Sequence, residues 1–138
     1  MQDKFAIPAT GRPALKDERY PNWLRRSAQG ATQGILYDPE MGQPVNLACS
    51  AAGYAWMATK KDEVAMRLVT KQGFGNHDDF GPQAPKTFKS LMTRVHAARK
   101  RGFALTTDVF LPAMSSTAAP VCDDAGNVRA MLIVVMVL

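Results

Sequence analysis

The candidate nucleophiles of this sequence are Cys49 and Ser116. Cys49 directly precedes a predicted helix, and the positive end of a helix dipole can lower the pKa of a thiol at that position. A cysteine nucleophile also needs a base, for which the chain offers His77 and His96. Ser116 lies just before a predicted strand, where a hydroxyl can bind a small ligand or simply stabilise a turn. A small enzyme that uses Cys49 or Ser116 is therefore one hypothesis.

The other polar clusters do not form a recognisable catalytic or cofactor site. His77, Asp78 and Asp79 carry groups that bind divalent metals, but adjacent residues cannot easily converge on one ion. The stretch 73–75 has the first two glycines of a dinucleotide-binding loop, yet it follows a predicted helix instead of a strand. The nucleophile-elbow, zincin and P-loop motifs are also missing from the sequence. We therefore expect neither a bound metal nor a cofactor.

The composition is that of one soluble globular domain. Hydrophobic residues make up 46% of the 138 residues and charged residues 21%, which is enough apolar material for one core. The net charge of +5 is concentrated in residues 1–33 and 86–101. These stretches could contact phosphates, but we favour a loosely ordered arm and a solvated helix face.

The cellular setting can be predicted from the cysteines and the apolar runs. The two cysteines do not form a CxxC pair, which indicates a reducing, cytoplasmic environment. The N-terminus has no apolar signal-peptide core, and the run at 131–138 is too short to span a bilayer. We therefore expect a cytoplasmic protein with no membrane partner.

The apolar pattern predicts a strand, three helices and then a set of antiparallel strands. Ser50 can cap the first helix, whose small residues would let other backbone or a ligand approach closely. Thr59 and Asp62 have the spacing of a capping box before the second helix, although Asp replaces the usual Glu or Gln. Helices are expected over 51–58, 62–72 and 88–101, and strands over 34–37, 103–107, 117–122 and 128–138.

The strands at the end of the chain decide the fold class. Residues 123–127 form a strong hairpin turn between two strands. The strand 128–138 is apolar on both faces, which is typical of a central strand covered on each side. The sequence therefore predicts an α+β fold with helices packed on an antiparallel sheet. We divide the chain into a basic segment, 1–33, and a folded domain, 34–138.

Three motifs of the folded domain resemble a known family. The run PVNLACSAAGYAWMA at 44–58 resembles the PLHATAxGKALLA signature of IclR-type transcriptional regulators. VHAARKRG at 95–102 and TAAPVCDDAGNVRA at 117–130 are similar to two later elements of that family, in the same order. The resemblance covers about residues 34–138 and identifies them as similar to the family's C-terminal effector-binding domain.

The resemblance implies a sensor domain similar to GAF and PAS domains. In the family a small metabolite, often a carboxylate or an aromatic acid, lies against the concave side of the sheet. The start of the signature helix supplies backbone contacts, which fall here on Ala51 and Ala52. The N–H groups at a helix start suit an anionic ligand.

Four further pocket positions of the family fall on Thr106, Ser116, Ile133 and Val135. Ser116 keeps a small polar group, whereas Thr106 replaces an acidic residue, and Ile133 and Val135 replace serines. These exchanges make the pocket less polar, so we expect an apolar ligand such as an aromatic acid and not a very small keto acid. The alternative is a pocket that has lost its ligand.

The resemblance also indicates which segments of the family this chain lacks. Family members carry an N-terminal winged helix-turn-helix and the first strands of the effector domain, for which residues 1–33 leave no room. We therefore expect either a fragment or a stand-alone sensor, which reaches operator DNA only through a domain absent from this chain. The resemblance implies a homodimer or homotetramer, and an open sheet edge favours pairing with another chain. A metabolite-sensing regulatory domain is the leading hypothesis, and the small enzyme is the alternative.

Overall fold

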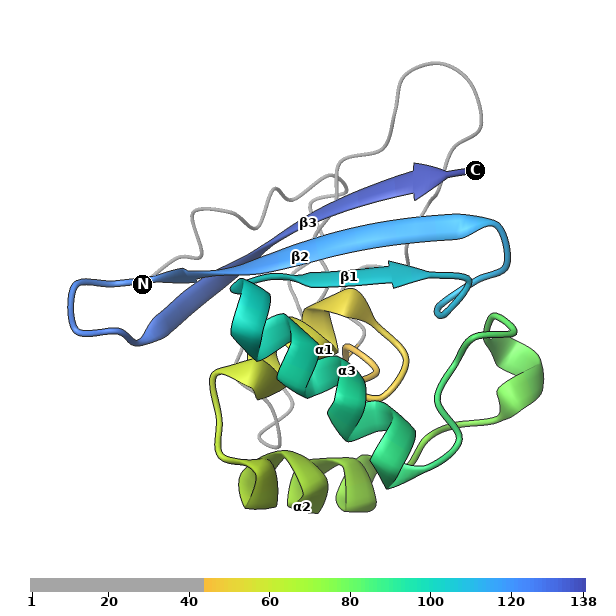
Figure 1. The fold of residues 1–138 in the computed structure, drawn as a ribbon, viewed down its shortest axis with the longest axis horizontal. Helices are drawn as coiled ribbons and strands as arrows, with labels where there is room; N and C mark the ends of the chain where they lie inside the picture. Colours follow the sequence, from red (N-terminus) through yellow and green to blue (C-terminus); the bar gives the residue numbers. More distant parts are fainter. Residues whose placement is uncertain (1–43) are drawn as a thin grey trace.

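The computed structural model describes residues 44–138 as three helices followed by an antiparallel sheet (Figure 1). The elements are α1 (Ala51–Ala58), α2 (Asp62–Gln72), the 3-10 turn η2 (His77–Asp79), α3 (Phe88–Arg101), β1 (Ala104–Thr107), β2 (Met114–Cys122) and β3 (Val128–Val137). This arrangement confirms the predicted α+β fold. The strand predicted over 34–37 and the basic segment 1–33 lie outside the described residues.

Side-chain caps begin two helices where the sequence placed them. The Ser50 hydroxyl accepts a hydrogen bond from the Gly53 N–H at 3.0 Å, at the start of α1. The Thr87 hydroxyl accepts one from the Ser90 N–H at 3.2 Å, at the start of α3. The left-handed residue Gly102, with φ of 86°, ends α3. Each cap pairs a backbone group that the helix itself leaves unpaired.

The capping box predicted before α2 is wrong. Thr59 follows directly on α1, and its hydroxyl donates a hydrogen bond to the Trp56 carbonyl at 2.6 Å. The N-cap of α2 is Lys61, which makes no side-chain capping bond. Thr59 therefore completes the last turn of α1 instead of beginning α2.

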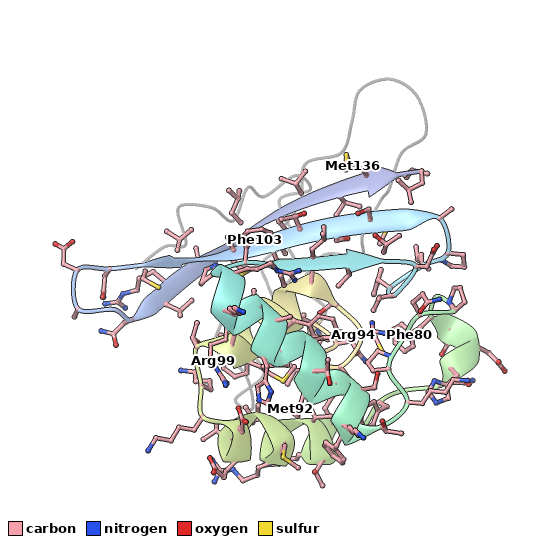
Figure 2. The ribbon with its side chains drawn as sticks, viewed as in Figure 1. Phe80, Met92, Arg94, Arg99, Phe103 and Met136 are labelled. Atoms are coloured by element: carbon pink, nitrogen blue, oxygen red, sulfur yellow. The ribbon has the colours of Figure 1, made fainter. Side chains whose placement is uncertain are left out.

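Arg99 of α3 fastens the connection between α1 and α2. Its guanidinium donates to the carbonyl oxygen of Ala58 at 3.0 Å and to that of Lys60 at 2.9 Å. It also donates to Asp62 Oδ1 at 2.8 Å. Figure 2 shows Arg99 on the side of α3 that faces this connection. The solvated face predicted for 86–101 therefore needs correction at Arg99, because this side chain pairs helix-end carbonyls.

The helices cover one face of the three-stranded sheet, whose strands lie in the order β1-β2-β3 (Figure 1). Both strand pairs are antiparallel, with Ala104 opposite Ala118 and Ala118 opposite Ile133. Ala104 and Ala118 are fully buried in the same core as α1. Side chains alternate between the two faces of a strand, so these two residues define the inner face.

Gly53 allows α1 to lie close to the turn that precedes it. A Cβ atom at Gly53 would overlap the carbonyl oxygen and Cα of Leu47. The expectation that small residues admit close backbone approach is thus confirmed at this position. Leu47 and Tyr54 are among the largest fully buried side chains, so this contact lies in the centre of the core.

The structure corrects two predictions about the last strands. Strand β3 is not covered on each side as predicted, because Leu132, Val134 and Met136 are each more than half exposed. Among residues 44–138 it pairs with β2 alone. Strand β2 begins at Met114 instead of residue 117, so Ser116 lies within the strand and not in a turn. The apolar pattern of β3 reflects exposed side chains, which sequence alone cannot tell from buried ones.

Candidate functional site

The turn at residues 46–50 positions the start of α1. Asn46 Oδ1 accepts from the Cys49 N–H at 2.8 Å, and the Ser50 hydroxyl donates to the Asn46 carbonyl oxygen. The buried Tyr54 hydroxyl reaches back to the segment before α1 and donates to the Ala48 carbonyl at 2.7 Å. These bonds fix the direction in which the first N–H groups of α1 point.

Two backbone donors at the start of α1 are left over. The N–H groups of Gly53 and Tyr54 are paired with the Ser50 side chain and carbonyl, respectively. Those of Ala51 and Ala52 have no hydrogen-bond partner among residues 44–138, although both residues are buried. Buried N–H groups are nearly always paired, so this pair of donors fits a ligand acceptor or water.

A row of three predicted site residues crosses the inner face of the sheet. Thr106 lies directly opposite Ser116, and Ser116 lies opposite Val135. Cross-strand partners point to the same face, so all three side chains share the face that carries Ala104 and Ala118. Ile133 is two residues from Val135 along β3, on that same face.

The middle of this row holds an unpaired hydroxyl. Ser116 is 7% exposed, and its Oγ has no hydrogen-bond partner in the described part of the chain. Thr106 Oγ1 donates to the Ser116 carbonyl across a long 3.4 Å. A buried hydroxyl without a partner costs free energy on the order of 1–3 kcal/mol, which a bound polar group would recover.

The six predicted site residues therefore come from α1 and from the three strands of the sheet on which it packs. Ala51 and Ala52 begin the helix that covers the inner face, and the other four lie on that face. At the β1 end of the row Thr106 is buried, whereas at the β3 end Ile133 is 41% exposed. The surroundings thus change from hydrogen-bonding groups at α1 and Ser116 to apolar side chains at the edge.

Cys49 does not have the environment of a nucleophile. Its side chain is fully buried, and burial raises the pKa of the thiol to about 11, which the charge of Arg94 offsets only in part. The thiol donates to the Phe74 carbonyl at 3.6 Å. The predicted lowering of this pKa by the helix start is wrong, because desolvation outweighs the dipole.

The two histidines do not serve either candidate nucleophile. His96 hydrogen-bonds to Asp62 at 2.7 Å, and His77 lies in the exposed turn η2. Cys122 is exposed at the end of β2, away from both histidines' elements. Within residues 44–138, no three His, Cys, Asp or Glu side chains are grouped so as to hold a metal ion.

Several residues that shape the site carried no signal in the sequence. The Gln72 amide accepts from the Leu47 N–H at 2.8 Å and donates to the Val45 carbonyl at 2.9 Å, which clamps the segment before α1. The loop after η2 pairs with the loop after β1 through Gly81 N–H and the Val109 carbonyl at 2.9 Å. A Cβ at Gly81 would overlap the Asp108 carbonyl, so glycine is required there.

A hollow of about 90 Å³ lies at the opposite end of α1, where Ala58, Phe103 and Pro120 line it. Typical ligand pockets have about 300–1,000 Å³, so this hollow is too small for a metabolite site. None of the helices in the described part of the chain has the length and run of apolar residues needed to span a bilayer.

The described residues match a protein family and the fold of several solved structures. The family "Bacterial transcriptional regulator IclR C-terminal" matches residues 30–137. An IclR regulator from Alicyclobacillus acidocaldarius is 18% identical with a TM-score of 0.63, covering 78% of this chain and 41% of its own. No curated protein sequence matches the chain.

Two further similar structures contain small aromatic acids. The inducer-binding domain of a PobR double mutant from Acinetobacter, with 3-hydroxybenzoic acid, is 18% identical with a TM-score of 0.62, covering 70% of this chain and 55% of its own. An IclR homolog from Microbacterium hydrocarbonoxydans, with 4-hydroxybenzoate, is 17% identical with a TM-score of 0.63, covering 75% of this chain and 41% of its own.

The present chain thus spans about half of these relatives or less. The TM-scores of 0.62 to 0.63 show a shared fold, and the family match covers most of the chain. The three motifs at 44–58, 95–102 and 117–130 all lie inside the matched range. On this evidence the chain belongs to the IclR family of bacterial transcriptional regulators, in the part that corresponds to their C-terminal domain.

Proposed function

We propose that this chain is an effector-binding domain that senses a small organic acid with an aromatic or otherwise apolar body. The domain extends over about 34–138, and ligand binding to it controls a DNA-binding domain outside this chain. As for other regulators of transcription in bacteria, the place of action is the cytoplasm. The proposal needs no catalytic group, in keeping with the buried thiol of Cys49.

The observation that carries the proposal is a set of polar groups between α1 and the sheet that have no partner within the described residues. The buried N–H groups of Ala51 and Ala52 are donors at a helix start, which favours a carboxylate. The buried hydroxyl of Ser116 supplies one more polar contact on the facing strand. A ligand acid that accepts from these groups would pair donors that have no partner among residues 44–138.

The apolar end of the row predicts the rest of the ligand. Ile133 and Val135 lie on the inner face beyond Ser116 and present no polar side-chain group. A benzene ring fits such surroundings better than the polar body of a small keto acid. The hydroxybenzoates held by two similar structures have this combination of carboxylate and ring.

Thermal-shift and calorimetric titrations with the full chain test the proposal. We expect 3- or 4-hydroxybenzoate, or another benzoate, to raise the melting temperature of the chain. The rise should increase with ligand concentration as one-site binding to the folded state requires. Glyoxylate and pyruvate should give no shift. A response to those keto acids alone would contradict the aromatic ligand, and no response to any organic acid would favour a pocket without a ligand.

A pair of variants locates the ligand. Ser116→Ala removes the inner hydroxyl and should weaken binding by about tenfold, since one hydrogen bond to a charged group contributes about 1.5 kcal/mol or more. Thr117→Ala changes the neighbouring residue, which faces the other side of the sheet, and should bind as the unmodified chain does. Equal affinities for both variants would place the ligand elsewhere.

A further inference from the structure

Arg94 of α3 borders the face by which this helix packs against the domain. It follows the buried Leu91 by three positions and precedes the buried Ala98 by four, so all three lie on neighbouring turns of one side of the helix. The Arg94 side chain is only partly exposed. Figure 2 shows Arg94 and Phe80 on the same side of α3, opposite to Arg99. Arg94 therefore does not belong to the solvated face predicted for 86–101.

The charge of Arg94 acts on two buried groups at the turn before α1. Burial raises the pKa of Tyr54, and the charge and hydrogen bond of the Arg94 guanidinium offset this only in part. Burial likewise raises the pKa of Cys49 to about 11, again with a partial offset by the charge of Arg94. The Tyr54 hydroxyl and the Cys49 thiol are therefore both neutral at pH 7. Neither group cancels the positive charge beside it.

No carboxylate of the described residues pairs with Arg94. Arg99 and Arg129 each form an ion pair with an aspartate, at 2.8 Å and 2.9 Å respectively. Arg94 forms no such pair within residues 44–138. A partly buried guanidinium normally has an anionic partner, because a charge that is removed from water costs free energy. The positive charge of Arg94 thus fits an anion that comes from outside residues 44–138.

A short chain of hydrogen bonds connects Arg94 with the donors at the start of α1. The guanidinium donates to the Tyr54 hydroxyl, which in turn donates to the Ala48 carbonyl at 2.7 Å. Ala48 lies three residues before Ala51 in the turn that leads into the helix. The charge of Arg94 therefore lies at the same end of α1 as the N–H groups of Ala51 and Ala52, which have no partner among residues 44–138.

We propose that Arg94 makes the effector site selective for acids, because its positive charge balances the carboxylate that Ala51 and Ala52 bind. The inference rests on the effector-binding function proposed above and names the residue that distinguishes an acid from a neutral compound of the same shape. The N–H groups alone distinguish the two less sharply, since a neutral amide oxygen also accepts hydrogen bonds from them. A full charge favours the acid over several ångströms in a poorly solvated site and needs no direct contact with it.

Paired calorimetric titrations with 4-hydroxybenzoate and 4-hydroxybenzamide test the proposal in the full chain. The two compounds share their ring and size, but only the first is charged at pH 7. We expect Arg94→Gln to weaken the binding of 4-hydroxybenzoate about tenfold or more and to change that of 4-hydroxybenzamide by less than about twofold. Arg94→Lys keeps the charge and should retain most of the affinity for 4-hydroxybenzoate. Where another benzoate binds more tightly, that acid and its amide form the pair.

Lys89→Gln is the matched control, because it removes the same charge from an exposed position of the same helix. It should leave both affinities within about twofold of the unmodified chain, since solvent and salt screen an exposed charge. Circular dichroism and the melting temperature without ligand establish that each variant is folded. If Arg94→Gln does not fold, Arg94→Met provides the same test, because it keeps an apolar stem that packs beside Leu91.

Three results would overturn the proposal, and they separate it from the proposed function. Unchanged binding of 4-hydroxybenzoate to Arg94→Gln would leave the effector site in place and exclude Arg94 from it. Equal weakening of the acid and the amide would show that Arg94 supports the fold of the site and does not select for charge. An unmodified chain that binds no organic acid at all would refute the proposed function together with this inference.

Discussion

His96 of α3 donates a hydrogen bond through Nε2 to Asp62 Oδ2 at 2.7 Å, which ties α3 to the first turn of α2. The second carboxylate oxygen accepts from Arg99 at 2.8 Å. The hydrogen bond from His96, followed by that from Arg99, holds the pKa of Asp62 below its ordinary value of 3.8. Because α2 buries only Ala65 and Val69, this carboxylate is a main link between α2 and the rest of the domain.

The lowered pKa of Asp62 predicts a pH-dependent effect of Asp62→Asn. The charged form is favoured in the folded state, so its contribution to stability is present above 3.8 and is lost as the pH falls through the folded pKa. We expect Asp62→Asn to lower the urea midpoint at pH 7 and to approach the unmodified chain below pH 3.8. Urea titrations at several pH values measure this difference.

Asp79→Asn in the exposed turn η2 is the matched control and should change the urea midpoint little at any pH. An effect of Asp62→Asn that is equally large at neutral and at acidic pH would show that the side chain acts through packing and not through its charge.

Local signals in the sequence predicted the parts of the fold that depend on neighbouring residues. The cap at Ser50 was readable because one side chain decides it. The hairpin turn was readable for the same reason: Asp123 Oδ1 accepts from the N–H groups of Ala125 and Asn127.

Interactions between distant residues were not readable. The Gln72 side chain bonds to Leu47 and Val45, which lie 25 and 27 positions earlier in the chain. A glutamine at this position does not by itself indicate these partners. The environment of Cys49 also depends on elements far along the chain, and a position before a helix did not reveal its burial. For the candidate site, the family resemblance supplied the residues, while the strand register shows that Thr106, Ser116 and Val135 form one row.

The close approach of α1 to its preceding turn makes Gly53→Ala strongly destabilising. The new methyl group would overlap the Leu47 backbone, which lies in the centre of the core and cannot move without displacing its neighbours. We expect a loss of about 1–3 kcal/mol in the free energy of unfolding, the usual cost of overpacking. Lys89→Ala, on the exposed side of α3, should change it by less than about 0.5 kcal/mol. Urea denaturation of the three chains gives these values, and a neutral Gly53→Ala would mean that α1 and residue 47 are further apart.

The different environments of the two cysteines predict a large difference in reactivity. Burial raises the pKa of Cys49 to about 11, whereas Cys122 is exposed. At pH 8 we expect a disulfide reagent to modify Cys122 rapidly and Cys49 only at the rate of unfolding. Cys122→Ser should abolish the fast phase and Cys49→Ser should retain it. A fast phase that persists in Cys122→Ser would show an accessible Cys49 and would restore it as a candidate nucleophile.

The Gln72 clamp predicts a graded response to substitution at this position. Gln72→Ala removes both bonds to the segment before α1 and should cost about 1–3 kcal/mol of the free energy of unfolding.

Gln72→Glu keeps an acceptor for the Leu47 N–H, but its carboxylate faces the Val45 carbonyl without a proton to donate. Protonation supplies that donor, so the folded state should raise the pKa of the introduced carboxyl above the ordinary value of about 4.3. The variant should therefore be less stable than the unmodified chain at pH 7 and approach it as the pH falls below 4.3, the reverse sign of a carboxylate stabilised by its charge. Thr70→Ala, an exposed position on the same helix, serves as control in the same urea titrations. A deficit of Gln72→Glu that does not change with pH would show that the Val45 carbonyl does not need this donor.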